Sequence, residues 1–182
     1  MRICESIGGT LRGVAQARYR LACAYLAVGR PETAAVEFTR ALAIVRERSD
    51  LLGLAYTLLG LAEARHRAGA VDEAERTLEE ALEVAGRTWS PIVEAKVRLY
   101  LGELHHQAGR SVPARAQLGA ALDLFRGIDA PPWVERTRAA LARAGEVCPD
   151  TAIARPGTTT GRPGPAAAQP GTAAVYRPIS PR

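Results

Sequence analysis

The chain has 182 residues, of which 47% are apolar and 5% aromatic, and it carries a formal net charge of +5. Its apolar residues are mainly Ala and Leu, which suit close-packed helices better than sheets. No stretch is long and apolar enough to predict a membrane span, and Cys4, Cys23 and Cys148 form no CxxC pair. We therefore expect a cytoplasmic protein without a disulfide framework.

A period of forty residues orders the predicted elements. The residues that recur at this period are Gly29, Gly69 and Gly109, then Leu21, Leu61 and Leu101, and the Ala-Leu pairs at 41–42, 81–82 and 121–122. A fixed period of this size is typical of a solenoid built from stacked helical hairpins. The sequence therefore predicts an all-α, right-handed helical-hairpin solenoid of about seven helices.

The chain begins out of phase with its own repeat. Residues 1–12 align with the end of a preceding second helix, and Thr10 falls on the position that starts the first helix of a unit. We interpret residues 1–12 as the remnant of a preceding repeat, which predicts that the chain is a fragment or the C-terminal part of a longer architecture. The alternative is a short, frayed N-terminal cap.

The repeat domain is predicted to span residues 13–145, because apolar residues recur there at spacings of three and four. Its units are 13–52, 53–92 and 93–132, followed by a capping helix within 133–145. The first helices are expected at about 14–28, 54–68 and 92–108, and the second helices at about 31–48, 71–86 and 112–126.

Turn residues agree with these boundaries. The three recurring glycines stand where a helix ends and the backbone must turn left-handed. Pro31 follows at a first-turn position, where its missing N–H costs nothing. Asp50 and Ser90 lie one period apart and are predicted helix N-caps.

Residues 146–182 change in composition. Seven of the twelve prolines lie here, together with Gly, Thr and Ala and few large apolar residues. Such a segment cannot bury enough apolar surface to offset the entropy of ordering it. We predict a disordered tail.

The pattern inside each unit resembles the tetratricopeptide repeat. The positions that carry the resemblance are Leu21, Ala22, Tyr25, Ala34, Phe38 and Ala41 in the first unit, Leu61, Ala62, Ala74, Leu78 and Ala81 in the second, and Leu101, Gly102, Ala114, Leu118 and Ala121 in the third. Arg65 and His105 replace the aromatic residue of the first unit. Small residues at such positions allow close helix approach.

The units are longer than the usual ~34 residues of that family. Units of this length, with starts such as Gly53-Leu54-Ala55, look like the C-terminal repeat arrays of large bacterial transcriptional regulators from high-GC bacteria, of the antibiotic-regulatory-protein type, and of related signal-transducing ATPases. The resemblance implies a sensing or docking module that binds a protein or peptide. The sequence contains no phosphate-binding loop of the GxxxxGK[ST] kind.

The resemblance also implies a partner-binding groove, because the first helices of such arrays line the concave face. Carried over to this chain, the groove residues are Tyr19, Tyr56, Leu59, Glu63, His66, Arg67, Lys96, Leu99, Glu103 and His106. The chain contains no Asn and places acidic residues in this groove, so a basic, Asn-rich clamp for a terminal carboxylate is not expected.

Other chemistry receives little support from the sequence. Two Glu-x-x-His motifs, at 63–66 and 103–106, resemble half of a carboxylate metal site, but the repeat itself explains the duplication. We expect no metal, no cofactor and no enzymatic activity. The alternative function is nucleic-acid binding through an Arg-rich terminal helix and tail, with Arg136, Arg138, Arg143 and Arg155 as the cations.

Overall fold

The computed structural model describes the backbone of residues 2–145 and the side chains of residues 11–145. The described backbone forms seven α-helices and no strand. They are α1 (Arg2–Ala27), α2 (Pro31–Glu47), α3 (Leu51–Arg67), α4 (Val71–Ala85), α5 (Pro91–Gln107), α6 (Ser111–Gly127) and α7 (Pro131–Gly145). The predicted disordered tail, residues 146–182, lies outside the described residues.

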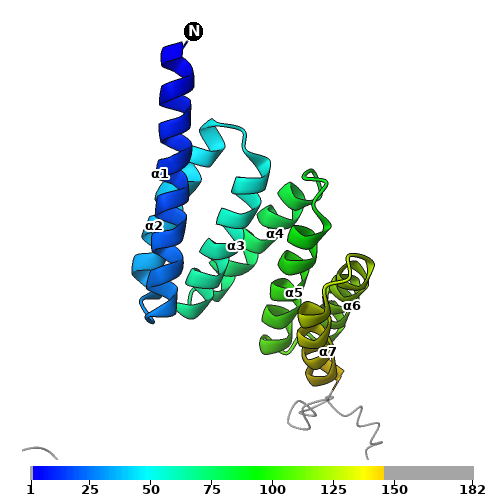
Figure 1. Cartoon of the computed structure of the whole chain (residues 1–182). Helices are drawn as coiled ribbons and strands as arrows, with labels where there is room; N and C mark the ends of the chain where they lie inside the picture. The colour runs from blue at the N-terminus through cyan, green and yellow to red at the C-terminus, as the bar shows by residue number, and fades with distance from the viewer. Residues whose placement is uncertain (1, 146–182) are drawn as a thin grey trace, which may run out of the picture. The chain divides into compact units, whose positions relative to one another are not determined.

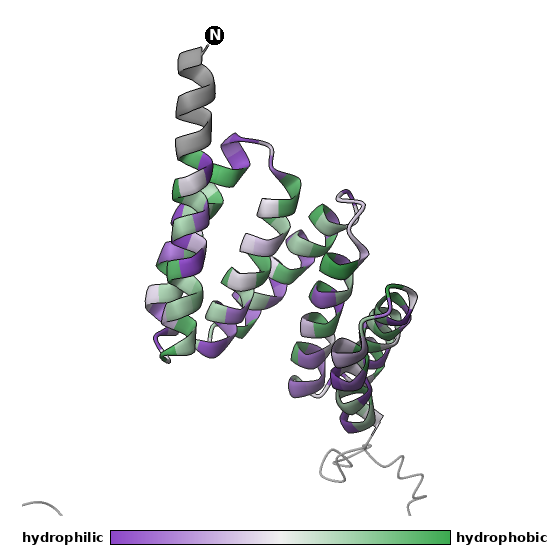
Figure 2. Ribbon diagram, viewed as in Figure 1, coloured by the Kyte–Doolittle hydropathy of each residue, from purple (hydrophilic) through white to green (hydrophobic). Residues whose placement is uncertain are grey.

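The seven helices stack as hairpins, with α1 at one end of the array and α7 at the other (Figure 1). Helices α1 and α2, α3 and α4, and α5 and α6 form the hairpins, and α2 packs on α3, α4 on α5, and α6 on α7. This arrangement confirms the predicted all-α solenoid. Hydrophobic and hydrophilic residues are interleaved along α2 to α7, as expected of helices buried on one side (Figure 2).

The turn inside each hairpin follows the predicted glycine. Gly29, Gly69 and Gly109 have φ of 73°, 84° and 72°. The residue after each of them donates its backbone N–H to a carbonyl five residues earlier, as Arg30 does to Tyr25 at 2.9 Å. This is the Schellman arrangement, in which a left-handed residue lets the chain satisfy the last carbonyls of a helix. The glycine positions are therefore confirmed.

The turns between hairpins use left-handed residues that are not glycine. Ser49, Trp89 and Asp129, again forty residues apart, have φ of 55°, 29° and 50°. Asp50 is confirmed as an N-cap, because its carboxylate accepts the backbone N–H of Gly53 at 2.9 Å. Ser90 is confirmed as the N-cap residue of α5, but its side chain, unlike that of Asp50, makes no capping hydrogen bond.

Helix α1 differs from the other helices in its length. It runs unbroken from Arg2 to Ala27, so the helix start expected near Val14, with Thr10 at its N-cap, is wrong. Neither Thr10 nor Gly13 interrupts the helix, because both residues still permit helical dihedrals when no N-terminal turn requires a break. The assignment of residues 1–12 to a preceding repeat stays a prediction.

The core forms two clusters that meet at α5. One side of α5, including Val97 and Leu101, packs with α1 to α4, and the other side, including Leu99, packs with α6 and α7. Small residues hold the helices close. A Cβ added to Gly102 would lie 2.6 Å from Cγ of Leu118, which shows how tightly α5 and α6 approach.

Candidate functional site

The odd-numbered helices form one layer of the solenoid. Helix α1 approaches α3, α3 approaches α5, and α5 approaches α7, with Cα atoms within 8 Å. In the described part of the chain, no even-numbered helix comes this close to the next even-numbered one. We therefore call α1, α3, α5 and α7 the inner helices. The array curves toward the more closely spaced layer, so the free side of the inner helices is its concave face.

Two tyrosines mark the N-terminal part of the concave face. Tyr19 on α1 packs edge-on against Phe38 of α2, with ring centroids 5.5 Å apart. Burial, followed by the neighbouring Cys23 thiol, raises the pKa of Tyr19 to about 12, so the phenol stays protonated at neutral pH. Tyr19 and Tyr56 of α3 both line a hollow of about 520 Å³, together with Gln16 and Asp50 among others.

The centre of the concave face is organised around Lys96, the single lysine of the chain. Its ammonium lies 5.7 Å from the ring centroid of Tyr56 on α3 and 4.7 Å from that of Trp133 on α7. Trp133 in turn stacks on the buried Phe125 of α6, with centroids 5.6 Å apart. Burial lowers the pKa of Lys96. Three inner helices thus meet at one partly desolvated cation held over aromatic rings.

Two glutamates lie on the same face, and arginines engage both. Glu63 on α3 accepts a hydrogen bond from Arg67 one turn later at 2.6 Å. Glu103 on α5 pairs with Arg136 of α7 at 3.0 Å. The Arg136 guanidinium also lies 5.0 Å from the ring centroid of Tyr100, which faces Glu63 across a 3.5 Å contact. Both carboxylates therefore already have an arginine of the protein as an ion-pair partner.

The structure sorts the predicted groove residues into two groups. Leu59 and Leu99 are core residues, exposed to 8% and 0%, and their prediction as groove residues is wrong. The helix turns them into the two hydrophobic clusters, away from the open side of α3 and α5. The other members retain accessible surface and stay predicted contacts: Tyr19, Tyr56, Glu63, His66, Arg67, Lys96, Glu103 and His106.

Three concave-face residues were absent from the predicted set: Tyr100, Trp133 and Arg136. A sequence signal was available for Arg136, because it lies one period after Lys96 and two after Tyr56. No comparable signal marks Trp133, whose equivalents are Val93 and Gly53. Its role depends on the packing of α7 against α6.

The repeated Glu-x-x-His motifs do not form a metal centre in the described residues. Their carboxylates are those of Glu63 and Glu103, which pair with Arg67 and Arg136. In residues 11–145, His, Cys, Asp and Glu side chains form no group of three or more that could hold a metal ion.

Two of the four arginines proposed for nucleic-acid binding pair with carboxylates. Arg136 pairs with Glu103, and Arg138 pairs with Glu135 at 2.6 Å. Arg143 is exposed near the end of α7, and Arg155 lies outside the described residues. No observation on α7 favours this alternative over protein binding.

Comparisons with known proteins agree with the repeat. The sequence model of the tetratricopeptide repeat matches residues 14–87. No curated protein sequence matches the chain. Within the described residues, no helix is both long and apolar enough to cross a membrane.

Solved structures share the fold. A Podosopora anserina protein described as a kinesin light chain with nearly identical TPR-like repeats, and a single-substitution variant of it, each superpose with a TM-score of 0.63 at 21% identity. Each match covers 71% of this chain and 64% of the other, so the chain spans less than two thirds of these structures. The Yersinia enterocolitica type III secretion translocator chaperone SycD has a TM-score of 0.59 at 21% identity, over 72% of this chain and 92% of SycD.

Proposed function

We propose that the chain is a protein–protein interaction scaffold that binds a protein or peptide segment along its concave face. The observation that carries this proposal is the position of Lys96 between Tyr56 and Trp133. Its ammonium has aromatic neighbours but, among the described residues, no carboxylate partner. A segment crossing this place gains contact with two rings and one cation, which is the composition expected of an interaction anchor.

The neighbouring side chains support binding rather than catalysis. Glu63 and Glu103, which could act as general bases, are held by arginines. The apolar anchors lie on helices rather than loops, so the surface is preorganised and a partner need not order it. The tetratricopeptide match to residues 14–87 is consistent with a scaffold role.

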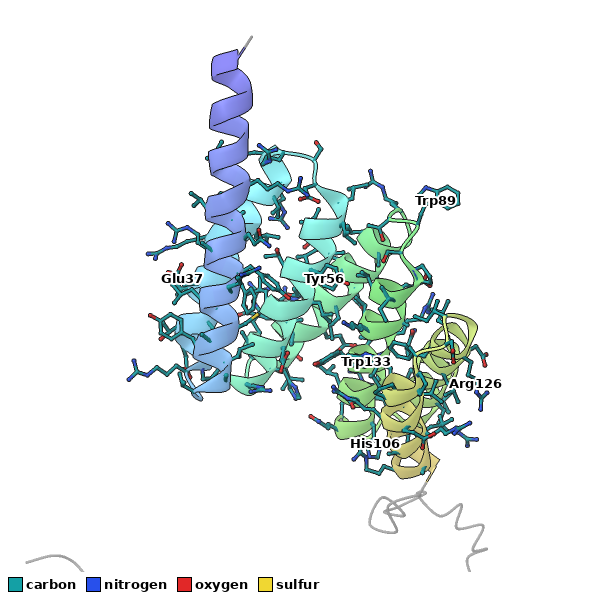
Figure 3. The ribbon with its side chains drawn as sticks, viewed as in Figure 1. Glu37, Tyr56, Trp89, His106, Arg126 and Trp133 are labelled. Atoms are coloured by element: carbon teal, nitrogen blue, oxygen red, sulfur yellow. The ribbon has the colours of Figure 1, made fainter. Side chains whose placement is uncertain are left out.

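Selection of peptides against the full chain tests the proposal. A phage-displayed peptide library yields binders, whose affinities are then measured by fluorescence anisotropy. We expect Trp133→Ala and Lys96→Ala each to weaken binding at least about tenfold, as for anchors at the centre of an interface. The matched control is Arg126→Ala, on the far side of α6 (Figure 3).

The control separates the concave face from the remaining surface. The proposal would be contradicted if Arg126→Ala weakened binding as much as Trp133→Ala and Lys96→Ala do. It would also be contradicted if neither Trp133→Ala nor Lys96→Ala changed the affinity. Circular dichroism of each variant, compared with the unmodified chain, establishes that the helices remain folded. Failure to select any binder would also contradict it.

The finer proposal is that this scaffold is the sensing or docking repeat module of a bacterial transcriptional regulator. Its support is the sequence resemblance of the forty-residue units to such repeat arrays. Deleting the gene in its host should change the transcript levels of a defined gene set. The unmodified gene should restore those levels, and the Trp133→Ala gene should not. Unchanged transcripts after deletion would contradict the regulator context while leaving the scaffold proposal open to its own test.

A further inference from the structure

One side of α1 is uncovered although the same side of α3 and α5 is covered. Leu21 of α1 is 44% exposed, whereas Leu61 and Leu101, one and two periods later, are 2% and 4% exposed. The α2 helix covers this side of α3, and α4 covers it on α5. Helix α1 lies at the end of the described array, where no helix takes that place (Figure 1).

The uncovered side extends along the helix. We call Gly13, Ala17, Leu21 and Ala24 the open face, and all four are exposed. Their equivalents on α5 are Val93, Val97, Leu101 and Leu104, and all four are buried in the cluster shared with α4. The open face is therefore equivalent to a surface that a neighbouring helix covers elsewhere in this protein, although its side chains are smaller. Exposed Val14 and Val28 widen its apolar area.

An arginine beside the open face indicates the charge of a helix that would cover this face. Arg110, the residue before α6, donates two hydrogen bonds to Glu75 of α4, at 2.7 and 2.6 Å. Arg30 precedes α2 at the equivalent position. In the junction between the first two units, both positions are Ala, namely Ala70 and Ala35. In the one described junction that has an arginine at this position, the preceding helix supplies a glutamate.

Within residues 11–145, the Arg30 side chain has no ion-pair partner, and Arg12 and Arg20 on α1 are also exposed. We propose that the open face of α1 binds an amphipathic helix of a partner protein, whose apolar stripe covers Leu21 and whose carboxylate pairs with Arg30. This surface lies at the end of the solenoid and is separate from the concave face.

The same charges disfavour a second copy of this chain as the occupant. Pairing two open faces would bring the exposed Arg12 and Arg20 of both copies together, and like charges oppose association. At the other end of the described array, α7 is not an acidic helix. Its exposed residues include Arg138 and Arg143 with Ala139 and Ala142, and its exposed acid, Glu135, pairs with Arg138.

The chain itself supplies a probe for the test. Helix α4 covers the equivalent side of α5, so a peptide of residues 70–87 carries both the apolar stripe and Glu75. A hydrocarbon staple replacing the exposed Arg76 and Glu83, two turns apart and away from the face that carries Glu75, keeps it helical. Binding of this peptide to the full 182-residue chain is measured by anisotropy and mapped by amide chemical shifts.

We expect saturable binding with shifts confined to residues 11–30. Leu21→Glu should weaken it at least about tenfold, and Arg30→Ala about threefold, as for an exposed ion pair. A peptide that carries Glu75→Gln should bind the unmodified protein and the Arg30→Ala variant with equal affinity. The control Val112→Glu alters another exposed apolar residue, 82% exposed on α6, and should leave affinity unchanged.

Several results would overturn the proposal. The first is absence of binding by the stapled peptide, whose helicity is checked separately by circular dichroism. The second is binding that Leu21→Glu and Val112→Glu weaken equally. The third is a concentration-dependent dimer in sedimentation velocity that Leu21→Glu dissociates, because the occupant would then be a second copy.

Discussion

Lys96 and Trp133 join two inner helices through a cation over an aromatic ring, with the ammonium 4.7 Å from the ring centroid. The contact fixes α7, the terminal helix, against α5. Trp133 also stacks on Phe125 of α6 at 5.6 Å. One side chain therefore connects α7 with both neighbouring helices and contributes to the concave face.

Replacement of Trp133 by alanine should destabilise the protein. We expect Trp133→Ala to lower the free energy of unfolding by about 2 kcal/mol, less than a fully buried tryptophan because its ring is partly exposed. Trp89, the other tryptophan, is 102% exposed and projects from the turn before α5 (Figure 3). Trp89→Ala should change stability by less than about 0.5 kcal/mol. Urea titrations of both variants make the comparison, and equal losses would contradict the packing described for Trp133.

The close approach of α5 and α6 makes Gly102 sensitive to substitution. A Cβ at this position would lie 2.6 Å from Cγ of Leu118, so Gly102→Ala should cost about 1–3 kcal/mol despite the better helix propensity of alanine. Gly119, within α6, has no atom within 4 Å of the same added Cβ. Gly119→Ala should therefore stabilise the protein by about 0.5–1 kcal/mol. Thermal melts of the two variants should shift in opposite directions, and a stabilising Gly102→Ala would disprove the tight contact.

Equivalent leucines should differ in their contribution to stability. Leu61 is buried between α2 and α3, so Leu61→Ala should cost about 2–5 kcal/mol. Leu21 occupies the same position on the uncovered side of α1, and Leu21→Ala should cost less than about 1 kcal/mol. Chemical denaturation measures both values. A loss at Leu21 as large as that at Leu61 would mean that α1 is covered in the isolated protein.

Acid should weaken the junction between α4 and α5. Burial and then Arg110 lower the pKa of His105 below 6.5, although Glu75 and Glu79 on α4 oppose this shift. The folded protein holds His105 neutral, so its contribution to the free energy of unfolding is fully present above pH 6.5. That contribution is lost as the pH falls below 6.5, because the histidine of the unfolded chain then takes up a proton. Hydrogen bonding from Arg110 lowers the pKa of Glu75 below 4.5 against the effect of burial, so a second loss begins as the pH falls below 4.5.

Two variants separate these losses. His105→Phe should remove the decline that begins below pH 6.5 and keep the one below pH 4.5, whereas Glu75→Gln should flatten the second decline. The measurement is the free energy of unfolding, obtained from urea titrations in buffers set to about pH 7, 5.5, 4.5 and 3.5. Stability that rises on acidification from pH 7 to 5.5 would contradict the neutral, buried state of His105.

Much of the fold could be predicted from the sequence because it depends on local rules that repeat. The glycines at the hairpin turns require left-handed backbone, and the apolar spacing identifies each helix. Ser49, Trp89 and Asp129 adopt the same backbone region without a glycine to reveal it. The sequence predicts a wrong start for α1, because aligning the repeats transfers a helix boundary even to a place where no turn forms.

The candidate site was less predictable because it depends on packing between helices. The period places Leu59 and Leu99 on the inner helices, but their orientation is set by the neighbours that bury them. Trp133 reaches the concave face through its stack on Phe125, a contact between residues that the period does not relate. The forty-residue spacing of Tyr56, Lys96 and Arg136 can be seen in the sequence. Only the structure shows that these residues take part in contacts between cations and aromatic rings.

Chemical-shift mapping of a selected peptide on the full chain, labelled with nitrogen-15, tests the central claim most directly. If the concave face is the binding surface, the largest shifts will fall on the inner helices around Tyr56, Lys96 and Trp133, including the indole N–H of Trp133 but not that of Trp89. Shifts confined to α2, α4 and α6, with the Trp133 indole unmoved at saturation, would contradict the account.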